Sequence, residues 1–135
     1  MPDKQVQLDD DGWCFACGPD NPHGLQLADF RWEQDAYVCQ FTPRRQHQGW
    51  KGLTHGGLIA TLLDEVMTRM LWQRDTLAMT AELAVRYLQP APVGETLTVR
   101  GTVQQRRGKL IAAHAEVVRS DGTIVATAQA KLVMV

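Results

Sequence analysis

Residues 52–72 read GLTHGGLIATLLDEVMTRMLW, and this stretch decides the fold. At 100° per residue, its large apolar side chains gather on one broad arc of a helix that begins near His55-Gly56-Gly57. An arc this wide is typical of a helix that a sheet largely buries. The arc holds Leu58, Ile59, Leu62, Leu63, Val66, Met67, Met70 and Leu71.

Strand-like patterns surround this helix. They predict two strands before the helix and four after it, over residues 25–32, 36–42, 80–88, 96–105, 110–119 and 123–135. Short turn sequences join the last three, which predicts an antiparallel meander. Six short strands cannot enclose the helix on both sides, so we expect an α+β fold with one antiparallel sheet wrapped around one long central helix. The uncovered edge of such a sheet favours pairing with a second subunit.

Composition limits the class of protein. The 135 residues fit one domain, which we assign to residues 13–135 after a flexible N-terminus at 1–12. A formal net charge of −1 gives no basic excess for binding nucleic acid. The N-terminus lacks a secretory signal, and charges interrupt the most apolar segment, 58–72. We therefore expect a cytoplasmic protein without a membrane partner.

The glycine-rich start of the helix is the first candidate site. The first N–H groups of a helix have no partner within it and carry partial positive charge, so the Gly56 N–H could stabilise a developing oxyanion. The other interpretation is a glycine-rich helix start that binds nothing. Spacing alone does not separate the two.

Asp64 is the candidate acid on the helix. It lies at the border of the apolar arc, where partial desolvation makes a carboxylate a better base. Thr68 follows one turn later and could hydrogen-bond the carboxylate or an attacking water. Glu65 is the rival acid, but it points to the opposite flank, where we expect an i,i+4 surface pair with Arg69.

Three segments carry a family resemblance. Residues 49–64 resemble the hotdog-fold thioesterases of the phenylacetic-acid-degradation type, as do residues 14–18 with 21–25 and residues 87–90 with 94–97. The likeness runs from residue 13 to the end of the chain. It implies a hotdog fold and hydrolysis of an acyl-CoA thioester by a homodimer or homotetramer. No cofactor is implied beyond the coenzyme A of the substrate.

The resemblance also implies residue roles. Asp64 would be the general base or nucleophile, the Gly56 N–H would polarise the thioester carbonyl, His55 would line the site and Thr68 would help to place water. Many members have an Asn or Gln where this chain has Gly49. The neighbouring His47 and Gln48 could take over that contact, so we include both with Gly57 as substrate-binding candidates.

Basic residues could contact the phosphates of coenzyme A. Arg106, Arg107 and Lys109 lie at a predicted hairpin, and Arg86 lies on a predicted strand. Arginine suits bidentate phosphate binding. The alternative for the hairpin is a solvated turn without a ligand.

Cys14-x-x-Cys17 with His23 suggests zinc, but a structural site needs four ligands. Only Cys39, isolated on a predicted strand, could complete the set. We therefore expect no metal and three reduced thiols, with the role of the cysteine loop left open.

Two other functions remain beside hydrolysis. A non-catalytic acyl-CoA-binding module is one, and a hotdog hydratase is the other, although its usual order of aspartate before histidine is reversed here. The sequence does not choose between an aryl and an aliphatic acyl group.

Overall fold

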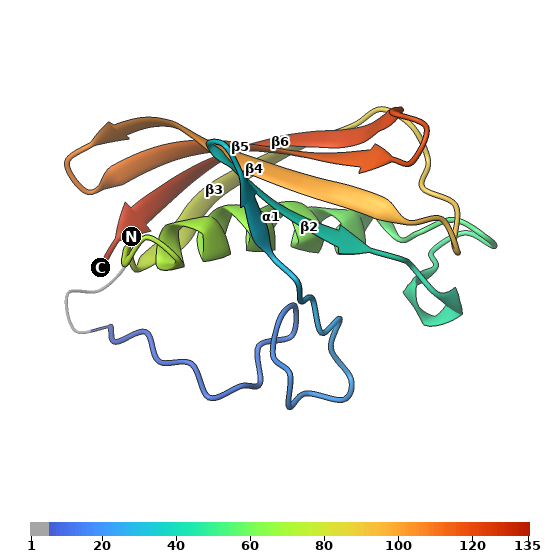
Figure 1. Ribbon diagram of the computed structural model, residues 1–135, viewed down its shortest axis with the longest axis horizontal. Helices are drawn as coiled ribbons and strands as arrows, with labels where there is room; N and C mark the ends of the chain where they lie inside the picture. Colours follow the sequence, from blue (N-terminus) through green and yellow to red (C-terminus); the bar gives the residue numbers. More distant parts are fainter. Residues whose placement is uncertain (1–5) are drawn as a thin grey trace.

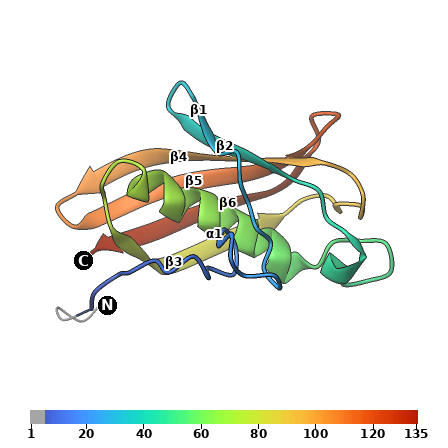
Figure 2. The same cartoon turned by 60° about the horizontal axis from the view of Figure 1, so that its bottom comes forward.

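The computed structural model describes residues 6–135 as one helix packed against one antiparallel sheet (Figure 1). The elements in chain order are β1 (Arg31–Glu33), β2 (Ala36–Phe41), the short 3-10 helix η1 (Arg45–His47), α1 (Gly56–Trp72), β3 (Ala78–Tyr87), β4 (Leu97–Arg107), β5 (Leu110–Arg119) and β6 (Ile124–Met134). The sheet covers one side of α1, and the N-terminal chain crosses the other side (Figure 2). The predicted architecture is confirmed.

The sheet has the order β1-β2-β4-β5-β6-β3, and every neighbouring pair is antiparallel. Strands β4, β5 and β6 form the predicted meander. Strand β3 follows the helix and returns to the far side of β6, so it is an edge strand. Nine of its ten residues pair with β6, and Ala81 lies at a register shift between Thr80 and Glu82.

The core lies between α1 and the inner face of the sheet. The apolar arc predicted from the sequence is the buried face of the helix, and Leu62, Leu63 and Met67 are completely inaccessible to solvent. Opposite them, residues of β4, β5 and β6 are buried in alternation along most of each strand, as period two requires. Burial of each large apolar side chain contributes about 1.5–3 kcal/mol, so this contact fixes the helix on the sheet.

The strand predicted at 25–32 is wrong over most of its length. Only Arg31–Glu33 pairs with β2. Gln26 and Asp29 have φ angles of 51° and 56°, in the left-handed region that interrupts a strand. Leu25 and Leu27 instead donate their N–H groups to the carbonyls of residues 15 and 16.

Residues 6–30 form an N-terminal strap over the exposed side of α1. Leu8, Asp9 and Asp10 line a cavity together with helix residues, so residues 6–12 lie against the domain. The predicted flexible segment 1–12 falls partly outside the described residues, which begin at residue 6. Within residues 6–135, no helix has the length and apolarity needed to cross a lipid bilayer.

A close approach of helix to sheet at Gly101 gives a prediction about stability. A Cβ atom added to Gly101 of β4 would lie 3.2 Å from Val66 Cγ1 on α1. We expect Gly101→Leu to lower the free energy of unfolding by about 1–3 kcal/mol, because the enlarged side chain overpacks a filled core. Urea denaturation measures the change. Thr102→Val, on the opposite face of the same strand, should change stability by less than about 0.5 kcal/mol. Equal midpoints for the two variants would contradict this account.

Candidate active site on the central helix

The start of α1 presents one free backbone donor. His55 is the N-cap, and its Nδ1 accepts the Gly57 N–H at 2.9 Å. The Gly56 N–H donates to no acceptor among residues 6–135, and the residue is exposed. Tyr87 of β3 donates its hydroxyl to the Gly56 carbonyl at 2.6 Å and so fixes the first turn. The Gly56 N–H is therefore unpaired in this part of the chain, whereas the Gly57 N–H is already occupied.

Two hollows of the surface meet at Gly56. One is lined by Gly49, Trp50, Thr54, His55 and Gly56, and the other by residues of the β3–β4 connection together with Gly56 and Tyr87. Trp50 is 85% exposed beside the first hollow. A group that reaches the Gly56 N–H thus has an open approach.

His47 and Gln48 hold the loop that precedes the helix. His47 is buried, its Nδ1 accepts the Arg44 N–H at 2.9 Å, and its carbonyl accepts the His55 N–H. Burial lowers the pKa of His47, which favours the neutral ring. Gln48 Oε1 accepts the Gly52 N–H at 3.1 Å. The contacts of both side chains support a structural role in the loop, beside the substrate-binding role proposed from the sequence.

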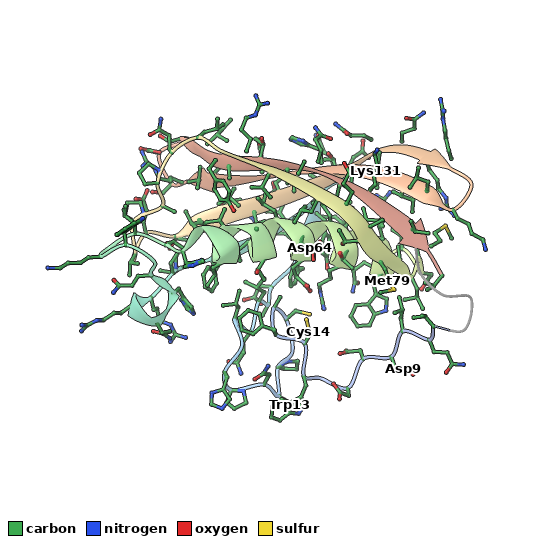
Figure 3. All side chains as sticks on the ribbon, turned by 180° about the vertical axis from the view of Figure 1, so that it is seen from behind. Asp9, Trp13, Cys14, Asp64, Met79 and Lys131 are labelled. Atoms are coloured by element: carbon green, nitrogen blue, oxygen red, sulfur yellow. The ribbon has the colours of Figure 1, made fainter. Side chains whose placement is uncertain are left out.

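Asp64 is held by a strand rather than by its own helix. Thr80 of β3 donates its hydroxyl to Asp64 Oδ1 at 2.6 Å. The predicted partner, Thr68, donates instead to the main-chain carbonyl of Asp64 at 3.0 Å, so the expected bond to the carboxylate is not formed. Helix spacing indicated Thr68, whereas Thr80 is contributed by the register of β3, which the sequence alone could not give. Figure 3 shows Asp64 on the helix beside this strand.

Asp64 and Gly56 are too far apart to act on one carbonyl within one chain. They are eight positions apart on α1, which corresponds to about 12 Å along the axis. A reacting thioester must lie within about 3 Å of both its oxyanion donor and the attacking water. The two candidate groups therefore belong to different regions of a single chain.

Glu65 does not form the predicted surface pair. No ion pair joins it to Arg69 in the part of the chain that the structure describes. The strap covers this flank, so Glu65 is half-buried and accepts a hydrogen bond from the Cys14 thiol at 3.9 Å. Burial raises the pKa of Glu65. Arg69 donates instead to Cys17 Sγ at 3.4 Å and lies over the ring of Phe30.

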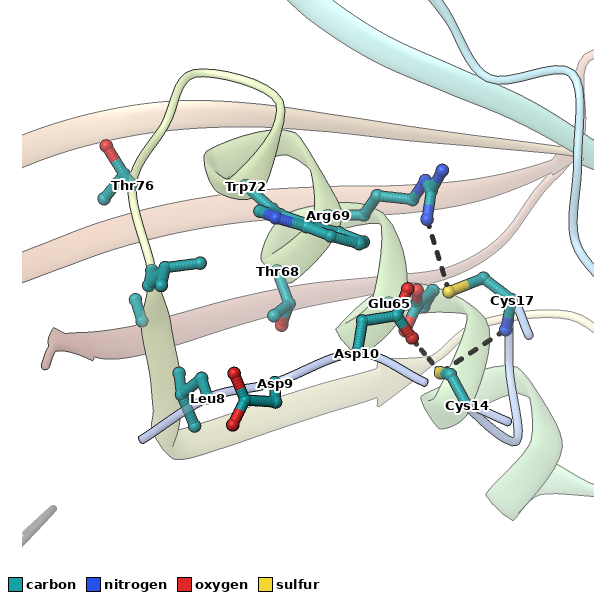
Figure 4. A pocket seen from close by; sticks show the side chains of 12 residues that line it. Leu8, Asp9, Asp10, Cys14, Cys17, Glu65, Thr68, Arg69, Trp72 and Thr76 are labelled. Atoms are coloured by element: carbon teal, nitrogen blue, oxygen red, sulfur yellow. Dashed lines mark hydrogen bonds between the residues drawn. The ribbon is translucent and has the colours of Figure 1, made fainter. Parts of the chain in front are cut away.

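A cavity of about 210 Å³ opens between the strap and the C-terminal half of α1 (Figure 4). Its lining combines Glu65, Thr68, Arg69 and Trp72 of the helix with Cys14 and Cys17 of the strap. Thr68 thus faces this cavity, although it does not contact the Asp64 carboxylate.

The basic candidates separate into two groups. Arg86 is exposed on β3 next to Tyr87, so its side chain points to the face of the sheet away from α1. Arg106, Arg107 and Lys109 are exposed at the β4–β5 hairpin, at the end of the sheet beyond the C-terminus of α1 (Figure 1). Within one chain, the hairpin is therefore remote from Gly56.

The four zinc ligands considered from the sequence are not brought together. Cys39 is fully buried in β2, and the one metal-ligand cluster among residues 6–135 contains neither Cys39 nor His23. That cluster joins Cys14 and Cys17 to Glu65, with all ligand atoms within 4.8 Å of one another.

Known proteins share this sequence pattern and this fold. The mouse (Mus musculus) acyl-coenzyme A thioesterase 13 is 30% identical over 77 residues, which are 56% of this chain and 54% of that protein. The Xenopus laevis acyl-coenzyme A thioesterase THEM4 is 30% identical over 90 residues, or 67% of this chain and 40% of that protein. The chain thus spans about half the length of the curated relatives it matches, or less.

Solved structures agree with the fold. The Escherichia coli PaaI protein of the phenylacetic acid degradation operon has a TM-score of 0.76 at 20% identity, over 82% of this chain and 80% of that one. The Streptococcus mutans protein smu.793, solved with acetyl CoA, has a TM-score of 0.74 at 20% identity, over 80% of this chain and 90% of that one. The hotdog fold implied by the resemblance is confirmed.

The sequence model of the thioesterase superfamily matches residues 51–126, which include the start of α1, Asp64 and Thr80. This match covers more than half of the 135 residues. The chain therefore belongs to the thioesterase superfamily.

Proposed function

We propose that the protein hydrolyses acyl-CoA thioesters, with Asp64 of one protomer and the Gly56 N–H of another acting on the same carbonyl. The observation that carries this proposal is the Thr80–Asp64 hydrogen bond on a helix whose first N–H group is free. The curated relatives named as acyl-CoA thioesterases and the neighbour solved with acetyl CoA support the substrate class.

In the proposed reaction, Asp64 takes a proton from water while the water oxygen attacks the thioester carbon. Thr80 fixes one carboxylate oxygen and leaves the other free to accept that proton. The carbonyl oxygen becomes an oxyanion that the Gly56 N–H stabilises. The C–S bond then breaks, and the proton on Asp64 passes to the departing CoA thiolate. Direct attack by the carboxylate, through an anhydride that water then hydrolyses, is the variant of this mechanism that the sequence left open.

A second protomer resolves the distance between the two groups. The free edge of β3 carries both Thr80 and Tyr87, and each contacts one of the two candidate sites on α1. Pairing of this edge with the same edge of another chain would satisfy its unpaired backbone groups. A two-fold axis there would place the Gly56 end of one helix toward the middle of the other. We propose a homodimer or a larger assembly built from such dimers.

The same arrangement offers positions for the CoA phosphates. Arg86 lies on the proposed interface strand, with its side chain on the outer face of the sheet. A basic hairpin that is remote from Gly56 in its own chain can approach the site of a neighbouring protomer. We propose Arg86, Arg106, Arg107 and Lys109 as phosphate contacts on this basis.

The acid that performs the chemistry can be identified by substitution. We expect Asp64→Ala to lower kcat for an accepted acyl-CoA by about a hundredfold or more, because the general base is lost. Asp64→Asn should lose activity similarly yet still bind acyl-CoA, because its shape and the Gly56 N–H remain. Glu65→Gln is the matched control and should retain most of the activity.

Steady-state release of CoA measures these effects, with circular dichroism to confirm folding. Near-normal turnover in Asp64→Ala would move the base to another residue. If the wild type binds acyl-CoAs and hydrolyses none of a broad panel, the non-catalytic binding module is the correct function.

The role of the Gly56 N–H can be tested by removing that group alone. Gly56 is the first helical residue, a position that accepts proline, and His55 has the extended conformation (φ −61°, ψ 133°) that proline requires before it. We expect Gly56→Pro to fold and to lose about 10²–10³-fold in kcat, as for the loss of one oxyanion donor. Gly56→Ala, whose Cβ would meet only ordinary contacts with Tyr87, keeps the N–H and should keep most of the activity. Equal kcat values for the two variants would exclude the N–H from the mechanism.

Mixing the two inactive variants tests the shared site. A dimer of one Gly56→Pro chain and one Asp64→Asn chain would contain one intact site and one doubly altered site. After unfolding and refolding of an equal mixture, half of the dimers are mixed, so we expect about a quarter of wild-type activity. Each variant refolded alone provides the control. Activity of the mixture no higher than the mean of the two controls would show that both groups act from one chain.

A further inference from the structure

We propose that Cys14, Cys17 and Glu65 form a zinc site that fastens the N-terminal strap to α1. The proposal concerns an ion outside the proposed catalytic groups, held by three protein ligands with water as the fourth, and it does not depend on the proposed hydrolysis. It reverses the expectation of free thiols, because the structure supplies a ligand from a segment that the sequence pattern did not connect to the cysteines.

The ligand atoms already lie at the separation that one metal ion requires. The two sulfurs and a Glu65 carboxylate oxygen are within 4.8 Å of one another, and Cys14 Sγ is 3.9 Å from Glu65 Oε2. Zinc bonds of about 2.3 Å to sulfur and about 2.0–2.2 Å to oxygen place neighbouring ligands of a tetrahedron about 3.5–3.8 Å apart. Small side-chain movements would therefore bring all three atoms into the coordination sphere.

The backbone of the strap favours a pair of thiolates on one ion. The spacing Cys-x-x-Cys lets both cysteines of a tight turn reach the same metal. Here the Cys17 N–H points at Cys14 Sγ at 3.4 Å, and the Gly18 N–H closes the turn on the Cys14 carbonyl at 2.8 Å. Gly18 leaves no room for a side chain, since an added Cβ would lie 2.4 Å from the Cys14 nitrogen. The turn is thus fixed before any ion binds.

Charge in the surroundings fits a divalent cation. Glu65 has no cationic partner within ion-pair distance in the described part of the chain. Two thiolates and one carboxylate carry three negative charges. A divalent ion would offset two, and the Arg69 guanidinium at 3.4 Å from Cys17 Sγ would offset the third. Arg69 would then donate to a metal-bound sulfur, a contact that commonly supports thiolate ligands.

The soft thiolate ligands and the four-coordinate geometry that they would share with Glu65 and one water molecule indicate zinc. Thiolate ligands select zinc over magnesium or calcium. Cys14, Cys17 and Glu65 all line the cavity of about 210 Å³ between strap and helix, so a water molecule in that cavity could complete the tetrahedron. A bound ion would cross-link residues 14–17 to the middle of α1.

Zinc binding by the purified chain of 135 residues tests the proposal directly. Metal-free protein kept reduced with a phosphine is titrated with zinc chloride in competition with a chromogenic chelator. We expect one zinc ion per chain. The affinity should fall on the order of tenfold or more in Cys14→Ser, Cys17→Ser and Glu65→Gln. Cys39→Ser is the matched control, because Cys39 lies outside the cluster, and it should bind zinc like the wild type.

Cobalt substitution and alkylation supply independent measurements. Cobalt(II) should give the intense visible bands of a tetrahedral site and a sulfur-to-cobalt charge-transfer band in the wild type. In the wild type, zinc should slow alkylation of Cys14 and Cys17 at least tenfold, a measurement that stands even if a cysteine variant does not fold. Three results would each overturn the proposal: less than one zinc ion bound per chain, an unchanged zinc affinity in Glu65→Gln, or an alkylation rate that is the same with and without zinc. None of these measurements depends on CoA release, so they test the zinc site separately from the proposed hydrolysis.

Discussion

Burial of one face of α1 against the sheet is the constraint on which the rest of the structure depends. Residues such as Leu62, Leu63 and Met67 lose all contact with solvent, and their burial fixes the rotation of the helix about its axis. Because successive residues are 100° apart, fixing the buried face also fixes where the polar residues point. Asp64 lies at the border toward β3, and Glu65 lies at the border toward the strap.

These two neighbouring acids therefore have different partners. Asp64 receives the hydroxyl of Thr80, a neutral donor that orients a carboxylate without adding charge. Glu65 meets two thiols and is half-buried beneath the strap. A rotation of the helix by one residue would move one acid into the surroundings of the other and turn the second acid into the core. The hydrophobic contact thus assigns each acid its surroundings.

The length of the same helix has a consequence for assembly. A rigid helix holds its first N–H and its central carboxylate about 12 Å apart, so neither can move to meet the other. An edge strand that contacts both positions, through Tyr87 and Thr80, offers a route by which a second chain could bring them together. In this view the unpaired edge of β3 belongs to the proposed chemistry as well as to the proposed dimer interface.

The sequence by itself determined the elements whose signals are local. The period of the apolar residues predicted α1 and its buried arc, and it placed Gly56 at the helix start and Asp64 at the edge of the arc. Turn residues predicted the β4–β5–β6 meander. These features depend on neighbours within a few positions, so pattern and propensity suffice to predict them.

Only the tertiary structure decided which distant groups meet. The partner of Asp64 is Thr80 rather than Thr68, because the register of β3 sets that contact and a threonine in a helix can satisfy its hydroxyl on the preceding turn. Glu65 turns toward Cys14 because a strap closed by its own backbone hydrogen bonds covers that flank. Left-handed residues at Gln26 and Asp29 divert the chain from the sheet into that strap. Such contacts join residues 16 positions apart, as from Asp64 to Thr80, or 51 positions apart, as from Cys14 to Glu65, and no local pattern encodes them.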